Sequence, residues 1–117
     1  MSLTNYKGPA DVQEFTAPAT VTAGTCVKIN DVLVYPLVSA ASGAKFNGVV
    51  RGEVEHAKLS AQAWTEGAQL NWDDTNKRFT TVTTGNFKAG YARKVAPNPS
   101  ATGTIFLTGV NLGAALA

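Results

Sequence analysis

The chain has 117 residues, of which 44% are hydrophobic and 15% are charged, and its formal net charge at pH 7 is +2. This length suits one domain and excludes a second hydrophobic core. The small net charge excludes a strong positive field for nucleic acid or an anionic membrane. Because the charged fraction is below the usual value of about 25%, we expect much neutral surface, part of it suited to cover by another chain.

The chain contains one cysteine, Cys26, so it cannot form an internal disulfide, and this usage is compatible with a reducing cytoplasm. Without a histidine near it in sequence, we expect Cys26 to be a packed and inert thiol. No apolar run approaches the ~20 residues of a membrane-spanning helix, and the N-terminus lacks the charged-then-apolar pattern of a secretory signal. We expect neither a nucleic-acid partner nor a membrane partner.

Residues 1–10 contain few apolar side chains and cannot build a core. We therefore expect a flexible N-terminal arm, extended or disordered in the isolated protein. Leu3 and Tyr6 provide this arm with apolar contacts for a partner surface, which makes them candidate interface residues.

Two short strands follow the arm, at residues 12–16 and 26–29. Asn30 and Asp31, directly after the second strand, suit a two-residue turn, although the Gly typical of such turns is absent.

The next extended segment, residues 32–38, presents apolar side chains on both faces, so both faces need cover. In so small a chain, we expect the core to cover one face and a closed barrel or another subunit to cover the other. Pro36 cannot donate to a ladder, which predicts an edge position or a bulge. The candidate oligomer or capsid interface is one of two alternating sets of side chains: Leu33, Tyr35 and Leu37, or Val32, Val34 and Val38.

The longest expected strand spans residues 45–54. Apolar and glycine positions alternate with polar ones along it, and Gly48 and Gly52 allow the sharp coiling found at the corners of small barrels. The apolar parity changes after His56, which predicts a bulge near residues 55–57.

Residues 64–92 predict a three-stranded meander. Leu70 and Trp72 share one face of its first strand, the alternation of a half-buried strand. Its first turn, at residues 73–76, is rich in Asp and Asn, whose side chains bond the backbone two residues on. Trp72 and Phe79 are aromatic anchors beside that turn.

A last strand is expected at residues 104–107. The chain then has about eight short strands separated by turns, a spacing typical of a small all-β barrel or sandwich. No segment has a sustained helical period, so we expect little helix. We expect residues 11–108 to form a single β domain and residues 109–117 to form a C-terminal tail.

His56 is the only histidine and the only candidate centre for a catalytic or metal site. Glu53 and Glu55 are its neighbours but fall on the opposite face of a strand, whereas a metal site needs three or four converging ligands. The acidic turn lacks the sixth-position Gly and the twelfth-position Glu of a calcium loop. We therefore expect a surface or interface histidine, no catalytic residue, no metal and no cofactor. A small hydrolase or metal enzyme around His56 is the weaker alternative.

Several short, glycine-centred motifs follow one another along the chain. They are Gly24, Val49-Val50-Arg51-Gly52-Glu53-Val54, Gly67, Leu70-Asn71-Trp72-Asp73, Phe79-Thr80-Thr81, Gly85-Asn86, Gly90-Tyr91-Ala92 and Thr102-Gly103-Thr104-Ile105-Phe106-Leu107. In this order, over roughly residues 11–108, they resemble a small protein family of tailed phages and prophages. That family was formerly of unknown function and includes capsid decoration, or cement, proteins. Residues 74–78 are more charged than the family pattern, and the segment after Leu107 is longer; both departures concern surface contacts.

The resemblance implies a small β-barrel or β-tulip that trimerises on the outer capsid at three-fold or quasi-three-fold positions, with the N-terminal arm reaching across subunits. It further implies a non-enzymatic protein whose partners are the major capsid protein and its own copies. Its place would be the outer surface of the virion, after synthesis in the cytoplasm of the bacterial host. Another virion component, of the tail or of the head-completion complex, is the main alternative.

Overall fold

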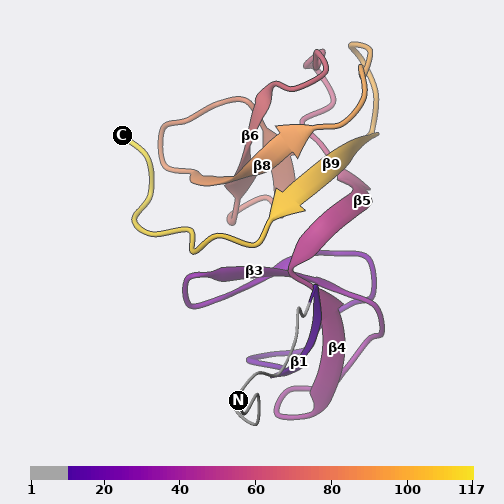
Figure 1. The fold of residues 1–117 in the computed structure, drawn as a ribbon, viewed down its shortest axis with the longest axis vertical. Coiled ribbons are helices and arrows are strands. Elements are labelled where there is room, and N and C mark those ends of the chain that lie inside the picture. Colours follow the sequence, from indigo (N-terminus) through magenta and orange to yellow (C-terminus); the bar gives the residue numbers. More distant parts are fainter. Residues whose placement is uncertain (1–10) are drawn as a thin grey trace, which may run out of the picture.

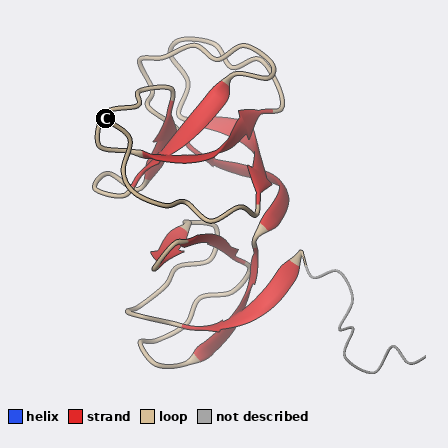
Figure 2. Ribbon diagram, turned by 60° about the vertical axis from the view of Figure 1, so that its left-hand side comes forward, coloured by secondary structure: helices blue, strands red, loops and turns tan. Residues whose placement is uncertain are grey.

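The computed structural model describes residues 11–117, which form nine strands in two antiparallel sheets that lie one above the other along the long axis (Figures 1 and 2). The all-β class predicted from the sequence is confirmed. Within this range the sheets stay open and do not form the expected barrel. One parallel bridge, between Lys58 and Phe79, links the end of one edge strand of the second sheet to the opposite edge strand. No helix in the same range is long and apolar enough to cross a membrane.

The four-stranded first sheet has the order β1-β4-β3-β2. Its strands are β1 (Val12–Thr16), β2 (Val27–Ile29), β3 (Val32–Pro36) and β4 (Lys45–Val49). The five-stranded second sheet has the order β5-β9-β8-β6-β7. Its strands are β5 (Arg51–Ala57), β6 (Gln69–Asp73), β7 (Arg78–Thr80), β8 (Phe87–Ala92) and β9 (Thr102–Thr108).

Residues 45–54, predicted as one strand, belong to two. β4 lies in the first sheet and β5 in the second, with Val50 at the corner between them. Gly52 has a φ of +146°, a conformation that side chains rarely adopt, and this supports the change of direction. Phe46 lies in one hydrophobic cluster and Val54 in another. The alternation of apolar positions continues across the corner, so periodicity alone does not reveal it.

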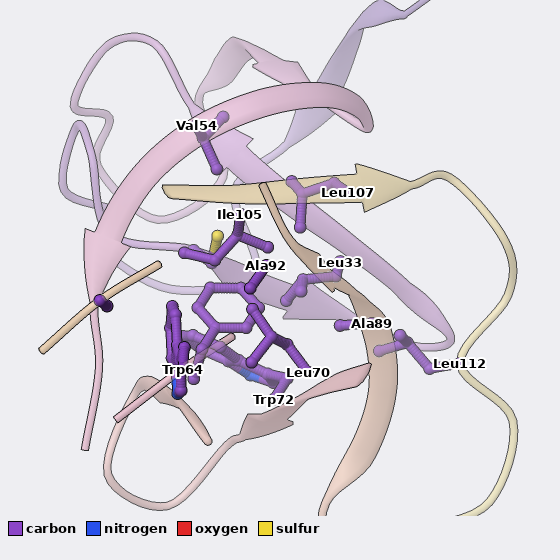
Figure 3. Packing of buried hydrophobic residues seen from close by; sticks show 13 residues of the cluster. Leu33, Val54, Trp64, Leu70, Trp72, Ala89, Ala92, Ile105, Leu107 and Leu112 are labelled. Carbon is purple, nitrogen blue, oxygen red and sulfur yellow. The ribbon is translucent and has the colours of Figure 1, made fainter. Parts of the chain in front are cut away.

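The length predicted one hydrophobic core, but the described residues contain two hydrophobic clusters. The large cluster joins the second sheet to one face of the first (Figure 3) and consists of Cys26, Leu33, Val54, Trp64, Leu70, Trp72, Phe79, Ala89, Ala92, Ala96, Ile105, Leu107 and Leu112. The small cluster covers the other face of the first sheet and consists of Ala17, Val21, Val34, Phe46 and Val50.

Strand β3 lies between these clusters, which differs from the expectation that a closed barrel or another subunit would cover its second face. Leu33 belongs to the large cluster and Val34 to the small one, and the chain therefore covers both faces itself. The predicted edge position is also wrong, because β4 and β2 flank β3. Pro36 is tolerated because β2 pairs no further than Val34, so the missing N–H faces no strand partner.

The predicted meander of residues 64–92 has a different strand order. β6 lies in the centre, with β7 on one side and β8 on the other. Residues 81–86 consequently cross one face of β6 and bury Asn71 completely. The Asn71 amide donates to the carbonyl oxygens of Thr81 and Val82, at 3.4 and 3.1 Å. Local alternation placed Asn71 on a polar face because it does not report a loop that crosses the sheet.

The segment after β9 runs back over the molecule and is hydrogen-bonded to both sheets. The N–H of Leu112 donates to the carbonyl oxygen of Asp31, beside β3, at 2.8 Å. The N–H of Leu116 donates to Asn86, beside β8, also at 2.8 Å. Leu112 is buried in the large cluster, so residues 109–117 contribute to the core.

Candidate functional site

His56 is not the surface or interface histidine expected from the sequence. Only 3% of its surface is exposed, and it lies on β5 on the same side as Val54. The β5–β9 register runs without interruption from Arg51 opposite Thr108 to Ala57 opposite Thr102, so the predicted bulge is absent from this strand pair. The parity change in the sequence arises because a histidine occupies a core position.

Both ring nitrogens of His56 bond to the backbone. Nε2 accepts the N–H of Cys26 at 2.9 Å, so Nδ1 carries the proton and donates to the carbonyl oxygen of Ala57 at 3.1 Å. Burial lowers the pKa of His56, and the hydrogen bond to Ala57 opposes part of that shift. Neither nitrogen is directed at solvent, as a general base or metal ligand would require.

The acidic neighbours of His56 point outward. Glu53 and Glu55 are exposed, and Glu53 accepts a hydrogen bond from Nε of Arg93 at 3.2 Å. The Arg51 guanidinium lies over the ring of Phe106, 5.4 Å from its centroid. Residues 11–117 contain no group of three or more His, Cys, Asp or Glu side chains able to hold a metal ion.

Cys26 is buried, as expected for a packed thiol. Burial raises the pKa of this thiol far above its ordinary value, which disfavours the reactive thiolate.

A buried lysine, Lys58, was not predicted. Its ammonium donates to the carbonyl oxygens of Leu59, Gln62 and Ser100 and lies over the ring of Trp64, 5.3 Å from its centroid. Burial lowers the pKa of Lys58. By bonding carbonyls on both sides, the side chain ties the loop after β5 to the loop before β9, a structural role.

The acidic turn forms as predicted. Oδ1 of Asp73 accepts the N–H groups of Thr75 and Asn76, both at 3.1 Å. Burial raises the pKa of Asp73, but the hydrogen bonds from Asn76 and Thr75 outweigh it, so the pKa lies below its ordinary value. The carboxylate is occupied by its own turn, which agrees with the interpretation as a turn rather than a calcium loop.

The candidate interface residues fall in different environments. Leu33 is buried in the large cluster, Tyr35 is half-buried against it, and Leu37 is 49% exposed. Leu3 and Tyr6 lie outside the described residues.

Leu37 has apolar neighbours on the same face of the first sheet. Tyr35 pairs with Val49, and Val49 pairs with Val12, which is 48% exposed. Leu37 follows two residues after Tyr35 and donates its N–H to Asn47 at 3.0 Å, so it continues this face. We call Val12, Tyr35, Leu37 and Val49 the first-sheet patch. Sequence alternation found two of its members; the other two depend on cross-strand pairing.

An open groove of about 490 Å³ lies between β8 and the C-terminal segment, with Gln69, Lys88, Tyr91, Asn111 and Leu112 among its lining residues. Beside it, the rings of Tyr91 and Phe106 stack with centroids 5.3 Å apart. No sequence pattern predicts this groove, because the segment that forms one wall returns over the sheet without a strand of its own.

A family model described as phage cement protein matches residues 8–107 of the chain. This range includes both sheets almost to the end of β9. No curated protein and no solved structure matches the chain.

Proposed function

The chain belongs to the phage cement protein family, and from this premise we propose that it binds the outer surface of a capsid and stabilises the shell without catalysing a reaction. The family match carries this proposal. A protein that binds only the assembled shell stabilises it by mass action, because separating the coat subunits then also requires losing the bound protein. Its direct partner would be the major capsid protein, and its place the outside of the virion.

The first-sheet patch supports this role as a contact surface. Leu37 and Val12 are each about half exposed, and they continue the face on which Tyr35 and Val49 lie. Removing a large apolar side chain from water contributes about 1.5–3 kcal/mol. The contributions of a few such side chains per copy combine when the copies are linked in one oligomer, because the linked copies then bind as one multivalent unit.

We propose further that the protein acts as a homotrimer. The support for a trimer is the family resemblance described above. Strand β3 gives no further support, since the two hydrophobic clusters of the same chain lie on its two faces. Closed cyclic symmetry lets an exposed patch meet its neighbour without forming fibres. Light scattering coupled to size exclusion measures the solution mass, and electron microscopy of decorated capsids measures the position. A ring of another order at the tail vertex would assign the protein to the tail or head-completion complex instead.

The substitution Leu37→Glu is expected to weaken capsid binding by about tenfold or more. Burying the exposed half of Leu37 contributes roughly 1 kcal/mol, a carboxylate buried in its place adds a further cost, and 1.4 kcal/mol corresponds to tenfold. Leu37 is exposed, so folding should change by no more than about 0.5 kcal/mol. Co-sedimentation with undecorated capsids measures the affinity. Val95→Glu is the matched control, because Val95 is 72% exposed and lies in the loop between β8 and β9 of the second sheet. Loss of binding in the control alone would place the contact elsewhere.

Deletion of residues 1–10 is expected to weaken capsid binding and leave thermal unfolding nearly unchanged. The reason is compositional, since the segment has few apolar side chains with which to support a core. Differential scanning calorimetry and co-sedimentation of the shortened protein measure the two effects. A large fall in the unfolding temperature would show that the segment belongs to the fold rather than to the contact with the capsid.

A further inference from the structure

His56 occupies the position where the two sheets meet. It is carried by β5 of the second sheet, and its ring packs against Trp72 and Phe79 of that sheet, with centroids 5.3 and 5.1 Å away. From the first sheet come Tyr35 on β3, at 6.4 Å, and the N–H of Cys26, directly before β2. One side chain therefore contacts four elements and joins the two halves of the molecule.

The contact to Cys26 depends on a neutral imidazole. Nε2 accepts the Cys26 N–H at 2.9 Å while Nδ1 donates to Ala57. Adding a proton at Nε2 would place two donors against each other, and the hydrogen bond would be lost. A buried donor without an acceptor costs about 1–3 kcal/mol, and more when it is charged.

No carboxylate among the groups in contact with His56 compensates a positive charge there. The titratable residues in contact with it are Cys26, from the segment before β2, through its backbone N–H, and Tyr35, from β3, through its ring. β6 and β7 present the rings of Trp72 and Phe79. None of these groups is a carboxylate, so an imidazolium at this position would be buried without an anionic partner.

We propose that His56 is an acid-sensitive connection between the two sheets, and that protonation at Nε2 breaks its bond to Cys26 and opens the contact between the first sheet and the second. In this opening the first sheet keeps the small cluster on its other face, while Cys26 and Leu33 leave the large cluster, so the change is local to the contact between the sheets. The inference concerns the isolated protein and holds whether or not the protein binds capsids.

The direction of the pH effect follows from the two states. Burial keeps the pKa of His56 below its ordinary value of 6.5 in the closed form, whereas an exposed imidazole in the open form titrates near that value. The open form therefore takes up the proton first as the pH falls. Above pH 6.5 neither form binds the extra proton, so the equilibrium between the closed and open forms does not depend on pH. Below pH 6.5 this equilibrium shifts toward the open form by about tenfold per pH unit, until the closed form also takes up the proton.

Hydrogen exchange and NMR at pH 7.5 and 5.0 test the proposal. His56 is the only histidine, so its ring signals report one titration. We expect that titration below pH 6.5, a shift of the Cys26 amide with the same midpoint, and a fall of at least about tenfold in protection of first-sheet amides, larger than that in β8 and β9. A His56 titration at or above 6.5, or equal loss of protection in both sheets, would overturn the inference.

The variant His56→Gln separates titration from packing, because its amide oxygen can accept the Cys26 N–H at every pH. Its protection in the first sheet should not respond to acid. Glu55→Gln is the matched control: it removes a neighbouring titratable group that is exposed, and the acid response should remain. If His56→Gln does not fold, the titration and exchange of the unmodified protein decide alone. A folded His56→Gln variant that opens in acid like the unmodified protein would contradict the proposal.

Discussion

Replacing Gly90 by alanine is expected to cost about 3 kcal/mol or more of unfolding free energy, at the upper end of overpacking effects. Gly90 lies on β8, paired with Leu107 of β9 and Leu70 of β6. A Cβ at this position would overlap the carbonyl oxygen of Phe106 and come within 3.0 Å of its carbonyl carbon. These are backbone atoms of a paired strand, so they cannot move aside without breaking the β8–β9 ladder. Urea denaturation followed by tryptophan fluorescence measures the loss.

Gly67→Ala is the control for this prediction. A Cβ at Gly67 meets nothing within 4 Å, but its φ is +84°, so the variant carries backbone strain without overlap. We expect a cost of about 1–2 kcal/mol there. Equal losses in the two variants would mean that the sheet accommodates the extra methyl at Gly90 and that close β8–β9 approach is not required.

Local chemistry made the positions of several elements predictable. Strand β1 has the predicted bounds, Val12–Thr16, because a loop with Pro18 ends a short β-type run. Asn30 has a φ of +51° within the predicted two-residue turn, a conformation that asparagine tolerates. The Asp73 turn forms through the side-chain bonds that its composition indicated. These features depend on neighbours a few residues apart, which a sequence displays directly.

The order of the strands was less accessible, since it depends on where the chain turns between sheets. The corner at Val50 leaves the period of two unchanged, and β7 is too short to show which side of β6 it occupies. The role of His56 was visible only in part. The alternation along β5 places His56 on the same inward face as Val54, with Glu53 and Glu55 on the outward face. Its hydrogen bond to Cys26 joins residues 30 positions apart, which no local pattern shows.

The interface residues were likewise predictable from the sequence only in part. Leu33 and Leu37 are equivalent in the sequence pattern, yet Leu33 lies in the large cluster and Leu37 lies beyond its edge. Which member of an apolar set remains exposed depends on the extent of the covering sheet, which no local pattern contains. The first-sheet patch thus keeps Tyr35 and Leu37 of the predicted set and adds Val12 and Val49 from two other strands.

Replacing Trp72 by alanine is the second change for which we expect a large effect, a loss of about 3–5 kcal/mol of unfolding free energy. Trp72 is fully buried in the large cluster (Figure 3), 5.0 Å from Phe79 and 5.3 Å from His56 between ring centroids. The cavity left by the indole would remove packing from the residues that join the two sheets. Since domains of this kind have about 5–15 kcal/mol in total, the variant should unfold at a much lower urea concentration.

The variant Trp72→Phe separates packing from hydrogen bonding, because it keeps a ring but removes the indole N–H that donates to Oδ1 of Asp74 at 2.9 Å. Burial raises the pKa of Asp74, and the bonds from Trp72 and Lys77 outweigh it. Losing the Trp72 donor should therefore raise that pKa and cost about 1–2 kcal/mol near neutral pH, less at a pH low enough to protonate Asp74. Urea denaturation at pH 7 and pH 3, followed by circular dichroism, measures both variants.

If Trp72→Phe lost as much stability as Trp72→Ala, the indole hydrogen bond rather than ring packing would hold this part of the core. A loss below about 1 kcal/mol in Trp72→Ala would show that the large cluster does not depend on this ring.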